Sequence, residues 1–404
     1  MSSYKQLGVE PIINACGSVT RLGGAPMPPE VLQAFHDGAK EWVSLEQLQA
    51  AASRKIAAAT GTEAGLVTCG SAAALTLGAA AIMCRFDLGR MERLPHCAGF
   101  PHEFVIAREQ RSGYDHAIRA SGALLVEVGF NEIVSNAGVR RTEVWEYEAA
   151  FGPNTAGVVY GHASDSQPDL KELVEAAHRH NIPVLVDAAG ELPPTDNLRA
   201  IPATGADLVG FSGGKAIRGP QATGILCGRR DLIASAALQL LDMDDHFELW
   251  DPPADFIDKS KLSGIPRHGI GRALKVSKEE IVALLTALDL FASGTYNEQL
   301  PEQREMLNSI ASALADQPAE CRIVESAGGE RLVLEITLDE SKLGLSAVEV
   351  CRRLRNGSPP VYVGHGRLAF GQLIVNPMCL DRISVEALTR RLAEELPVSL
   401  EKTR

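Results

Sequence analysis

The chain has 404 residues, a formal net charge of −12 and 45% hydrophobic residues. This length is too great for one small hydrophobic core, so it predicts two domains. The negative charge argues against a large nucleic-acid-binding surface, which would present many Lys and Arg side chains to phosphates.

The sequence shows no membrane or secretory feature. No run of about 18 apolar residues could span a bilayer, and the N-terminus has no apolar signal core. The eight cysteines are scattered, with no Cys-x-x-Cys pair and no His cluster at zinc spacing. We therefore expect a cytoplasmic protein with reduced cysteines and no metal site. Cys16 and Cys69 fall near the site discussed below, and a thiol role for either stays open.

Residues 44–60 show the apolar spacing of a helix. A short apolar strand follows and breaks at Gly70, after which Ser71 opens a helix rich in alanine. Ser71 is a good N-cap residue, and the free N–H groups of the first turn, including those of Gly70 and Ala72, would bind a phosphate. The alternative is a capped core helix without a ligand.

Strands and helices then alternate to about residue 235. Residues 168–180 have the apolar spacing of an amphipathic helix between two strands. This alternation predicts an α/β fold with a mostly parallel central sheet and helices on both faces. The predicted strands are Phe104–Ala107, Leu124–Val128, Gly157–Tyr160, Val184–Asp187, Leu208–Phe211 and Gly224–Cys227.

Asp187 ends an apolar run, Ile182-Pro-Val-Leu-Val-Asp187, that is typical of a buried parallel strand. Ligands of open α/β sheets bind at such strand ends. A pyridinium nitrogen would be a suitable partner, because the carboxylate keeps the ring protonated and the ring then withdraws electrons from a bound amino acid. A helix cap or a structural salt bridge would explain Asp187 equally well.

Lys215 lies 28 residues further on, in Phe211-Ser-Gly-Gly-Lys215. A strand gives way there to a tight turn, which would hold the lysine rigidly at the end of a sheet. Such an amine can form a Schiff base with a carbonyl cofactor. A lysine after two glycines is more often an ordinary turn residue. However, a phosphate cradle, a ring-nitrogen carboxylate and a Schiff-base lysine, each at a strand end, are far more specific together than singly.

The rest of the chain predicts a second, smaller domain. The acidic stretch 242–266 is typical of an irregular loop, and residues 277–295 predict a long connecting helix. A helix from residue 300 comes next, then a strand at 331–337, a helix near 347–354, and strands near Val361 and at 368–375. This order predicts a small α+β C-terminal domain.

We expect three segments in the chain. Residues 1–45 form an N-terminal segment that packs on the small domain and on a dimer partner. Residues 46–295 form the large cofactor-binding domain, and residues 296–404 form the small C-terminal domain.

Six segments carry a resemblance to a known family. They are Pro11-Ile-Ile-Asn-Ala-Cys-Gly-Ser18, Leu22-Gly-Gly-Ala-Pro-Met-Pro-Pro-Glu-Val31, Tyr114-Asp-His-Ala-Ile-Arg-Ala-Ser-Gly-Ala123, Asp187-Ala-Ala-Gly-Glu-Leu-Pro-Pro194, Phe211-Ser-Gly-Gly-Lys215 and His268-Gly-Ile-Gly-Arg-Ala-Leu-Lys-Val-Ser-Lys-Glu-Glu-Ile281. Together they resemble the fold-type I enzymes that depend on pyridoxal 5'-phosphate (PLP). Within these, the chain is similar to the branch of selenocysteine synthase (L-seryl-tRNA selenium transferase) and D-glucosaminate-6-phosphate ammonia-lyase. The resemblance covers nearly the whole chain and is not specific for a substrate.

The resemblance implies roles for individual residues. Lys215 would carry PLP as a Schiff base and move the Cα proton, Asp187 would pair with the ring nitrogen, and His116 would stack on the open face of the ring. His116 could instead be a hydrogen-bonded loop residue, and Glu191 could orient a neighbour or be a solvated charge. The candidates for the cofactor phosphate are Gly70, Ser71, Ala72 and Ser212.

Sites of this family lie at a dimer interface, so the resemblance implies a homodimer or a higher multiple of dimers. Arg272 and Lys275 could then supply positive charge to the phosphate or the substrate, or they could be a surface pair. A bidentate arginine is the natural partner of the substrate carboxylate. His365 stands near the place where the family pattern has an arginine. The candidate arginines are Arg21, Arg218, Arg267 and Arg367.

The function that the resemblance implies is that of a PLP-dependent lyase. It would remove the Cα proton of an amino acid or amino sugar acid and eliminate the β-substituent, giving a 2-oxo acid and ammonia. The same carbanion chemistry would serve an aldolase, a racemase or an aminotransferase. A selenocysteine synthase-type transferase is the runner-up, but the chain has no separate tRNA-binding domain before Pro11 and is strongly acidic. The third alternative is a non-catalytic protein with the fold of PLP enzymes or a phosphate-binding protein.

Overall fold

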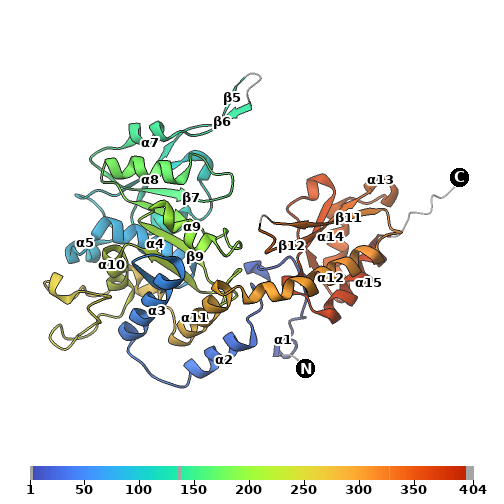
Figure 1. Cartoon of the computed structure of the whole chain (residues 1–404), viewed down its shortest axis with the longest axis horizontal. Helices are drawn as coiled ribbons and strands as arrows, with labels where there is room; N and C mark the ends of the chain where they lie inside the picture. Colours follow the sequence, from blue (N-terminus) through green and yellow to red (C-terminus); the bar gives the residue numbers. More distant parts are fainter. Residues whose placement is uncertain (1–2, 135–137, 327, 397–404) are drawn as a thin grey trace. The chain divides into compact units, whose positions relative to one another are not determined.

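The computed structural model describes residues 3–134, 138–326 and 328–396 (Figure 1). It divides into two compact units. Residues 27–293 form the large unit, and residues 1–26 join residues 294–404 in the small unit. The domain boundaries expected after residues 45 and 295 stay a prediction. In the part of the chain that the structure describes, no helix is long and apolar enough to cross a membrane.

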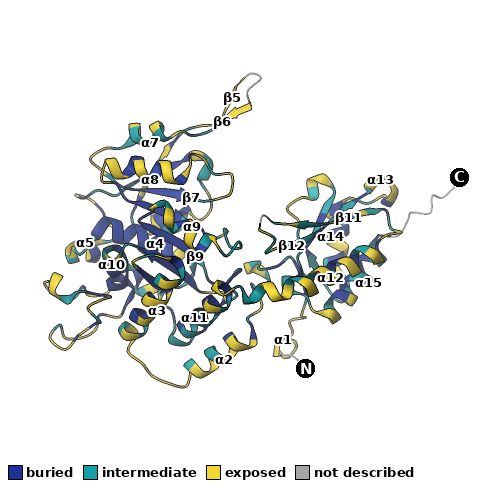
Figure 2. Ribbon diagram, in the orientation of Figure 1, coloured by how far each residue is buried: buried dark blue, intermediate teal, exposed yellow. Residues whose placement is uncertain are grey.

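The large unit contains a seven-stranded sheet in the order β2-β10-β9-β8-β7-β3-β4. Neighbouring strands are parallel except where β10 pairs with β2 and β9, which confirms the predicted mostly parallel sheet. The middle strands are buried along most of their length, which explains their near-continuous apolar sequences (Figure 2). The strands are β2 (Ala64–Thr68), β3 (Glu103–Ala107), β4 (Leu124–Val128), β7 (Thr155–Gly161), β8 (Val184–Asp187), β9 (Leu208–Ser212) and β10 (Gly224–Gly228).

Helix α4 (Gly70–Cys84) packs along β7 to β10 and is buried from Ala73 to Cys84. Its small side chains allow this close approach, since a Cβ on Gly78 would lie 2.9 Å from Cδ1 of Leu185. The predicted crossover helix is α8 (Leu170–Arg179), which buries one apolar face. The other helices of the large unit are α2 (Pro29–Gly38), α3 (Leu45–Thr60), α5 (Leu88–Arg93), α6 (Asp115–Ala120), α7 (Val144–Ala150), α9 (Asn197–Ala200), α10 (Arg230–Leu240) and α11 (Lys278–Ala292), and a hairpin joins β5 (Glu132–Val134) to β6 (Gly138–Arg140).

Two local predictions were wrong. Ser71 is not the N-cap of α4, because the chain already turns at Gly70, whose φ of +82° favours glycine, and Cys69 takes the cap position. The predicted strand at 368–375 is shorter than expected. Residues 368–370 form a 3₁₀ turn, Gly371 follows with φ +68°, and only Gln372–Val375 (β14) is a strand.

The acidic stretch 242–266 is irregular, as predicted, apart from a 3₁₀ turn at Lys259–Lys261. It is nevertheless part of the core. Trp250, Phe256 and Ile257 are almost fully buried in the same hydrophobic cluster as α4 and α10. These apolar side chains hold the segment against the large unit although it lacks regular hydrogen bonding.

The small unit contains an antiparallel sheet of β11 (Ala319–Glu325), β12 (Leu332–Leu338) and β14. A separate parallel pair joins β1 (Ile13–Ala15) to β13 (Val361–Val363), so the start of the chain belongs to this unit. One hydrophobic cluster joins these strands to the helices. The smaller α+β part of the predicted fold is therefore present. The helices are α1 (Ser3–Gln6), α12 (Leu300–Ala313), α13 (Glu340–Leu343), α14 (Ala347–Asn356) and α15 (Arg382–Glu395).

Candidate functional site

The strand order of the large unit brings several sequence candidates to one edge of the sheet. Asp187 is the last residue of β8, and Ser212 is the last residue of β9, the neighbouring strand. Gly224 begins β10 and pairs with Ser212 on one side and with Thr68, the end of β2, on the other. The carboxyl ends of three strands therefore meet at one place, which is where open α/β sheets bind ligands.

The first turn of α4 lies at this edge and can hold an anion. Thr68 Oγ1 donates a hydrogen bond of 2.9 Å to the carbonyl of Gly70, which fixes the turn between β2 and α4. The side chain of Cys69, the N-cap residue, makes no capping bond, so it leaves the N–H groups of residues 70–72 to another acceptor. Gly224 closes the other side, because a Cβ there would lie only 2.4 Å from the carbonyl carbon of Gly70. We call this turn, residues 69–72, the cradle.

Lys215 lies in the turn after β9 and is half-buried. The turn is held by backbone bonds from Gly213 N–H to the carbonyl of Thr223 and from Gly219 N–H to the carbonyl of Gly213, both 2.9 Å. A Cβ on Gly213 would lie 2.3 Å from Oγ1 of Thr223, and one on Gly214 would lie 2.5 Å from Cα of Gln221. Two glycines are therefore required to let this turn pack closely, and the lysine that follows is held in place.

Burial raises the pKa of the Asp187 carboxyl group above its ordinary value. The Ala189 N–H, which donates a 3.0 Å hydrogen bond to Asp187 Oδ1, and the positive charge of Lys215 act in the opposite direction and lower this pKa. A half-buried carboxylate at this edge is stabilised by a cationic partner. A protonated ring nitrogen is a group of that kind.

His162 is a residue that the sequence reasoning missed. It follows β7, and its backbone N–H donates a 2.9 Å bond to the carbonyl of Asp187. Its Nδ1 lies 3.7 Å from Oε2 of Glu191, and among the described residues this buried nitrogen has no hydrogen-bond partner. The signal was a histidine two positions after a predicted strand and one position beyond Gly161, which pairs with Asp187.

His116 lies in the first turn of α6 and is exposed, with its Nδ1 3.1 Å from Nη2 of Arg119. Helix α6 packs against α4, where Thr76 Oγ1 donates a 2.7 Å bond to the carbonyl of Ala117. The structure thus places His116 on a helix beside the one that forms the cradle. Its stacking role stays a prediction.

The two candidate arginines of the large unit differ. Arg218 lies three residues after Lys215, has φ +61°, and donates its backbone N–H to the carbonyl of Lys215 at 3.1 Å. The side chain of Arg267 is 87% exposed and pairs with Glu92, whose pKa falls to about 2. Arg21 and Arg367 belong to the small unit, where Arg367 Nη1 lies 3.0 Å from Oε1 of Glu335.

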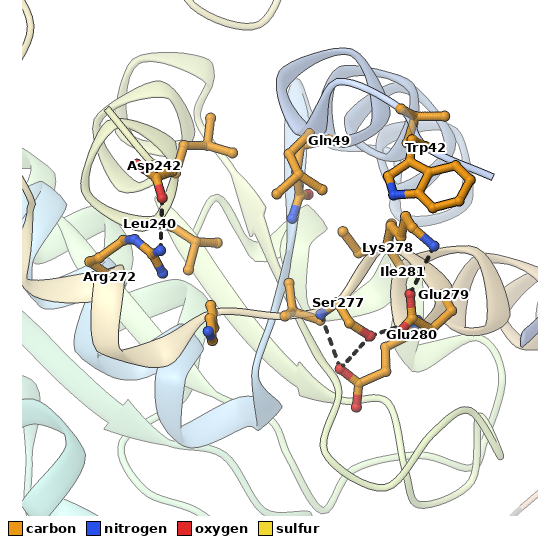
Figure 3. A pocket seen from close by; sticks show the side chains of 15 residues that line it. Trp42, Gln49, Leu240, Asp242, Arg272, Ser277, Lys278, Glu279, Glu280 and Ile281 are labelled. Atoms are coloured by element: carbon orange, nitrogen blue, oxygen red, sulfur yellow. Dashed lines mark hydrogen bonds and ion pairs between the residues drawn. The ribbon is translucent and has the colours of Figure 1, made fainter. Parts of the chain in front are cut away.

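Arg272 and Lys275 line a pocket of about 550 Å³ between the connection from α2 to α3, the end of α10 and the start of α11 (Figure 3). Arg272 Nη2 pairs with Asp242 at 2.7 Å. Glu280, which accepts a 3.1 Å bond from the N–H of Ser277, also lines the pocket. Burial, followed by the negative charge of Glu280, raises the pKa of the Cys69 thiol.

The residues at this edge fit PLP. The cradle offers uncapped N–H groups to a phosphate, and the half-buried Asp187 suits a protonated pyridine nitrogen. Lys215 supplies an amine close enough for its charge to act on Asp187. Cys69 stands at the cradle, whereas Cys16 lies in the small unit.

Comparison with known proteins agrees with this chemistry. The family model described as SelA, L-seryl-tRNA selenium transferase, matches residues 114–242, a segment that includes Asp187 and Lys215. A 5'-C-glycyluridine monooxygenase-decarboxylase of Streptomyces sp is 31% identical over 97% of this chain and 92% of its own length. A D-glucosaminate-6-phosphate ammonia lyase of Salmonella typhimurium is 28% identical over 97% of both chains.

A solved structure of D-glucosaminate-6-phosphate ammonia-lyase superposes with a TM-score of 0.80 and 26% identity, and the match covers 98% of both chains. The likeness in sequence and in fold thus extends over both units. The chain belongs to the fold-type I PLP-dependent enzymes, in the branch related to L-seryl-tRNA selenium transferase.

Proposed function

We propose that this protein is a lyase that acts on an amino acid or amino sugar acid. It would remove the Cα proton and eliminate the β-substituent. The enamine that results takes up water and yields a 2-oxo acid and ammonia. The observation that carries the proposal is the end-to-end likeness to an ammonia-lyase, in sequence and in fold.

Bound PLP acidifies the Cα hydrogen of an attached amino acid by withdrawing electrons. The other steps fall to the chain. The amine of Lys215, held by the glycine turn, would take the proton from Cα. The carboxylate of Asp187 would hold a proton on the ring nitrogen, and the N–H groups of the cradle would bind the phosphate.

The residues next to Asp187 have supporting roles in this proposal. His162 fixes the end of β8 through its bond to the Asp187 carbonyl. Glu191 lies beside the His162 ring and would keep the imidazole in one orientation. Arg218, next to Lys215 in the same turn, is the candidate of the large unit for the substrate carboxylate.

A second candidate function is oxygen-dependent decarboxylation of an amino acid. The specific observation in its favour is the 31% identity with a relative named as a monooxygenase-decarboxylase. Both candidates would use the same two residues, with Lys215 to carry PLP and Asp187 to pair with its ring nitrogen. They differ in products, because decarboxylation by a monooxygenase consumes dioxygen and releases carbon dioxide.

The first experiment tests whether Lys215 binds PLP. The visible absorption of purified protein is recorded with added PLP, before and after borohydride, beside Lys215→Ala. We expect a band that borohydride converts into a stable adduct on Lys215 and that the variant lacks. Peptide mapping that finds the adduct on another lysine would refute the assigned role of Lys215.

The second experiment tests the reaction. D- and L-hydroxyamino acids and amino sugar acids, with and without phosphate, are screened for ammonia, 2-oxo acid, oxygen uptake and carbon dioxide. The lyase proposal predicts equal amounts of ammonia and 2-oxo acid without oxygen uptake. Oxygen uptake matched by carbon dioxide would establish the second candidate instead, and racemisation or retro-aldol cleavage without ammonia would exclude both.

A further inference from the structure

Two side chains of α3 bond to the outer edge of the large sheet. Strand β2 lies at one end of the strand order and pairs with β10. Gln49 Nε2 donates a 2.9 Å hydrogen bond to the carbonyl of Val67, and Gln49 Oε1 accepts a 3.1 Å bond from the Val67 N–H. Ser53 Oγ accepts a 3.0 Å bond from the N–H of Gly65. The two side chains therefore bond to backbone groups at the side of β2 where a further strand would otherwise pair.

The contact between α3 and β2 is buried and closely packed. Gln49 is 1% exposed and Ser53 is 4% exposed. Ile56 lies on the same face of α3, and a Cβ on Gly65 would lie only 2.3 Å from its Cγ2. A buried amide side chain is costly unless it is hydrogen-bonded, so the two bonds between Gln49 and Val67 are needed to keep this glutamine in the core.

The Gln49 contact lies next to the cradle. Val67 is two residues before Cys69, where the cradle begins. Thr68, between them, donates its Oγ1 hydrogen bond to the carbonyl of Gly70 and pairs with Gly224 of β10. The end of β2 is therefore held from both sides, by β10 on one side and by a single glutamine side chain on the other.

We propose that Gln49 is a positioning residue for the phosphate of PLP. Because it bonds both backbone groups of Val67, it holds the end of β2 as a partner strand would. The N–H groups of residues 70–72 are then kept where a phosphate can accept from them. Without Gln49 the edge can shift, and only the fraction of molecules with a correctly placed cradle binds the phosphate. The inference rests on the proposed binding of phosphate by the cradle, and not on the lyase reaction.

The test is a titration of the full-length apoprotein with PLP, followed by visible absorption, for wild type and Gln49→Leu. Leucine fills a similar space but leaves the N–H and the carbonyl of Val67 without the amide that bonds them. Since two buried hydrogen bonds are lost, we expect the dissociation constant for PLP to rise about tenfold or more. An affinity within about twofold of wild type would overturn the proposal.

Ser53→Ala is the matched control. It removes a buried hydrogen bond from the same helix to the same strand, but its partner Gly65 lies four residues before Cys69. Ser53→Ala should lower the melting temperature, as Gln49→Leu does, and still bind PLP within about twofold of wild type. An equal loss of affinity in Ser53→Ala and Gln49→Leu would show that α3 only holds the sheet together, and would refute the specific role of Gln49.

Gln49→Glu separates positioning from folding, and it decides the proposal if Gln49→Leu does not fold. A protonated carboxyl group has one O–H donor and one acceptor oxygen, so it can make both bonds to Val67, whereas an ionised carboxylate cannot donate. The dissociation constant for PLP is compared with that of wild type at each pH, which cancels the titration of PLP itself. The ratio should be close to unity near about pH 5 and about tenfold higher near pH 8. A ratio that does not change with pH would contradict the proposal.

Gly224→Ala distinguishes failure of this inference from failure of the cradle. Its added Cβ would lie 2.5 Å from the amide nitrogen of Ser71, so this variant perturbs the cradle from the β10 side. If Gly224→Ala weakens PLP binding and Gln49→Leu does not, the cradle holds the phosphate and the role of Gln49 is refuted. If neither variant weakens PLP binding, the proposed phosphate site is refuted together with the role of Gln49.

Discussion

Replacing Gly224 by alanine should damage the cradle directly. The added Cβ would lie 2.4 Å from the carbonyl carbon of Gly70 and 2.5 Å from the amide nitrogen of Ser71. Ordinary van der Waals contact begins near 3.4 Å, so the backbone of the cradle must move by about 1 Å. Overpacking of this kind costs about 1–3 kcal/mol of stability.

The same displacement should weaken cofactor binding. Moving an amide by about 1 Å breaks a hydrogen bond to a phosphate oxygen, and bonds to charged groups contribute about 1.5–3 kcal/mol. We therefore expect the dissociation constant for PLP to rise about 10- to 100-fold. The assay is a titration of the apoprotein with PLP, followed by visible absorption, together with the melting temperature.

Gly210 supplies a matched control on the neighbouring strand β9. A Cβ on Gly210 would meet Cβ of Ala74 at 3.6 Å, which is an ordinary contact. Gly210→Ala should therefore bind PLP within about twofold of wild type, because no backbone has to move. If Gly224→Ala and Gly210→Ala bind PLP equally well, the first turn of α4 does not hold the phosphate.

Two further predictions concern stability. Burial raises the pKa of Asp187 in the folded chain, so ionisation of this carboxyl group lowers the stability of the fold as pH rises through that pKa. The apoprotein of Asp187→Asn should therefore have a higher melting temperature than wild-type apoprotein at pH 7.5. The difference between the two melting temperatures should shrink toward pH 4. A lower melting temperature of the variant at pH 7.5 would contradict this sign. Ser277→Ala should lower stability by about 1 kcal/mol, because it removes the capping box with Glu280 at the start of α11. The control is Ser309→Ala, within α12, and the free energy of unfolding of both variants is measured with urea. An equal loss of stability in Ser277→Ala and Ser309→Ala would refute the capping argument.

The sequence alone predicted much of the large unit. All six predicted strands appear in the sheet, because each is a short, mainly apolar run between turn residues, and all but the edge strand Leu124–Val128 are largely buried. The position of Asp187 at a strand end and of Lys215 in a tight turn after a strand also followed from local sequence. Details that depend on backbone conformation did not follow, such as the turn at Gly70 that displaced Ser71 from the cap position.

The partners of charged side chains could not be predicted, because they come from distant parts of the chain. Arg267 pairs with Glu92, 175 residues away, whereas Arg355 has no carboxylate partner among the described residues and lies over the Tyr362 ring, as Arg21 does. Nothing in the local sequence distinguishes these arginines.

Local sequence thus determined the order of strands and helices, since apolar spacing and turn residues act over a few positions, and the resemblance to a known family indicated the cofactor. Only the tertiary structure decided which groups meet. The pairing of β10 between β2 and β9 brings Gly224 against the cradle, and the pairing of β1 with β13 lets Arg21 reach Tyr362. Strand pairing depends on contacts between residues far apart in the chain, and no short pattern encodes it.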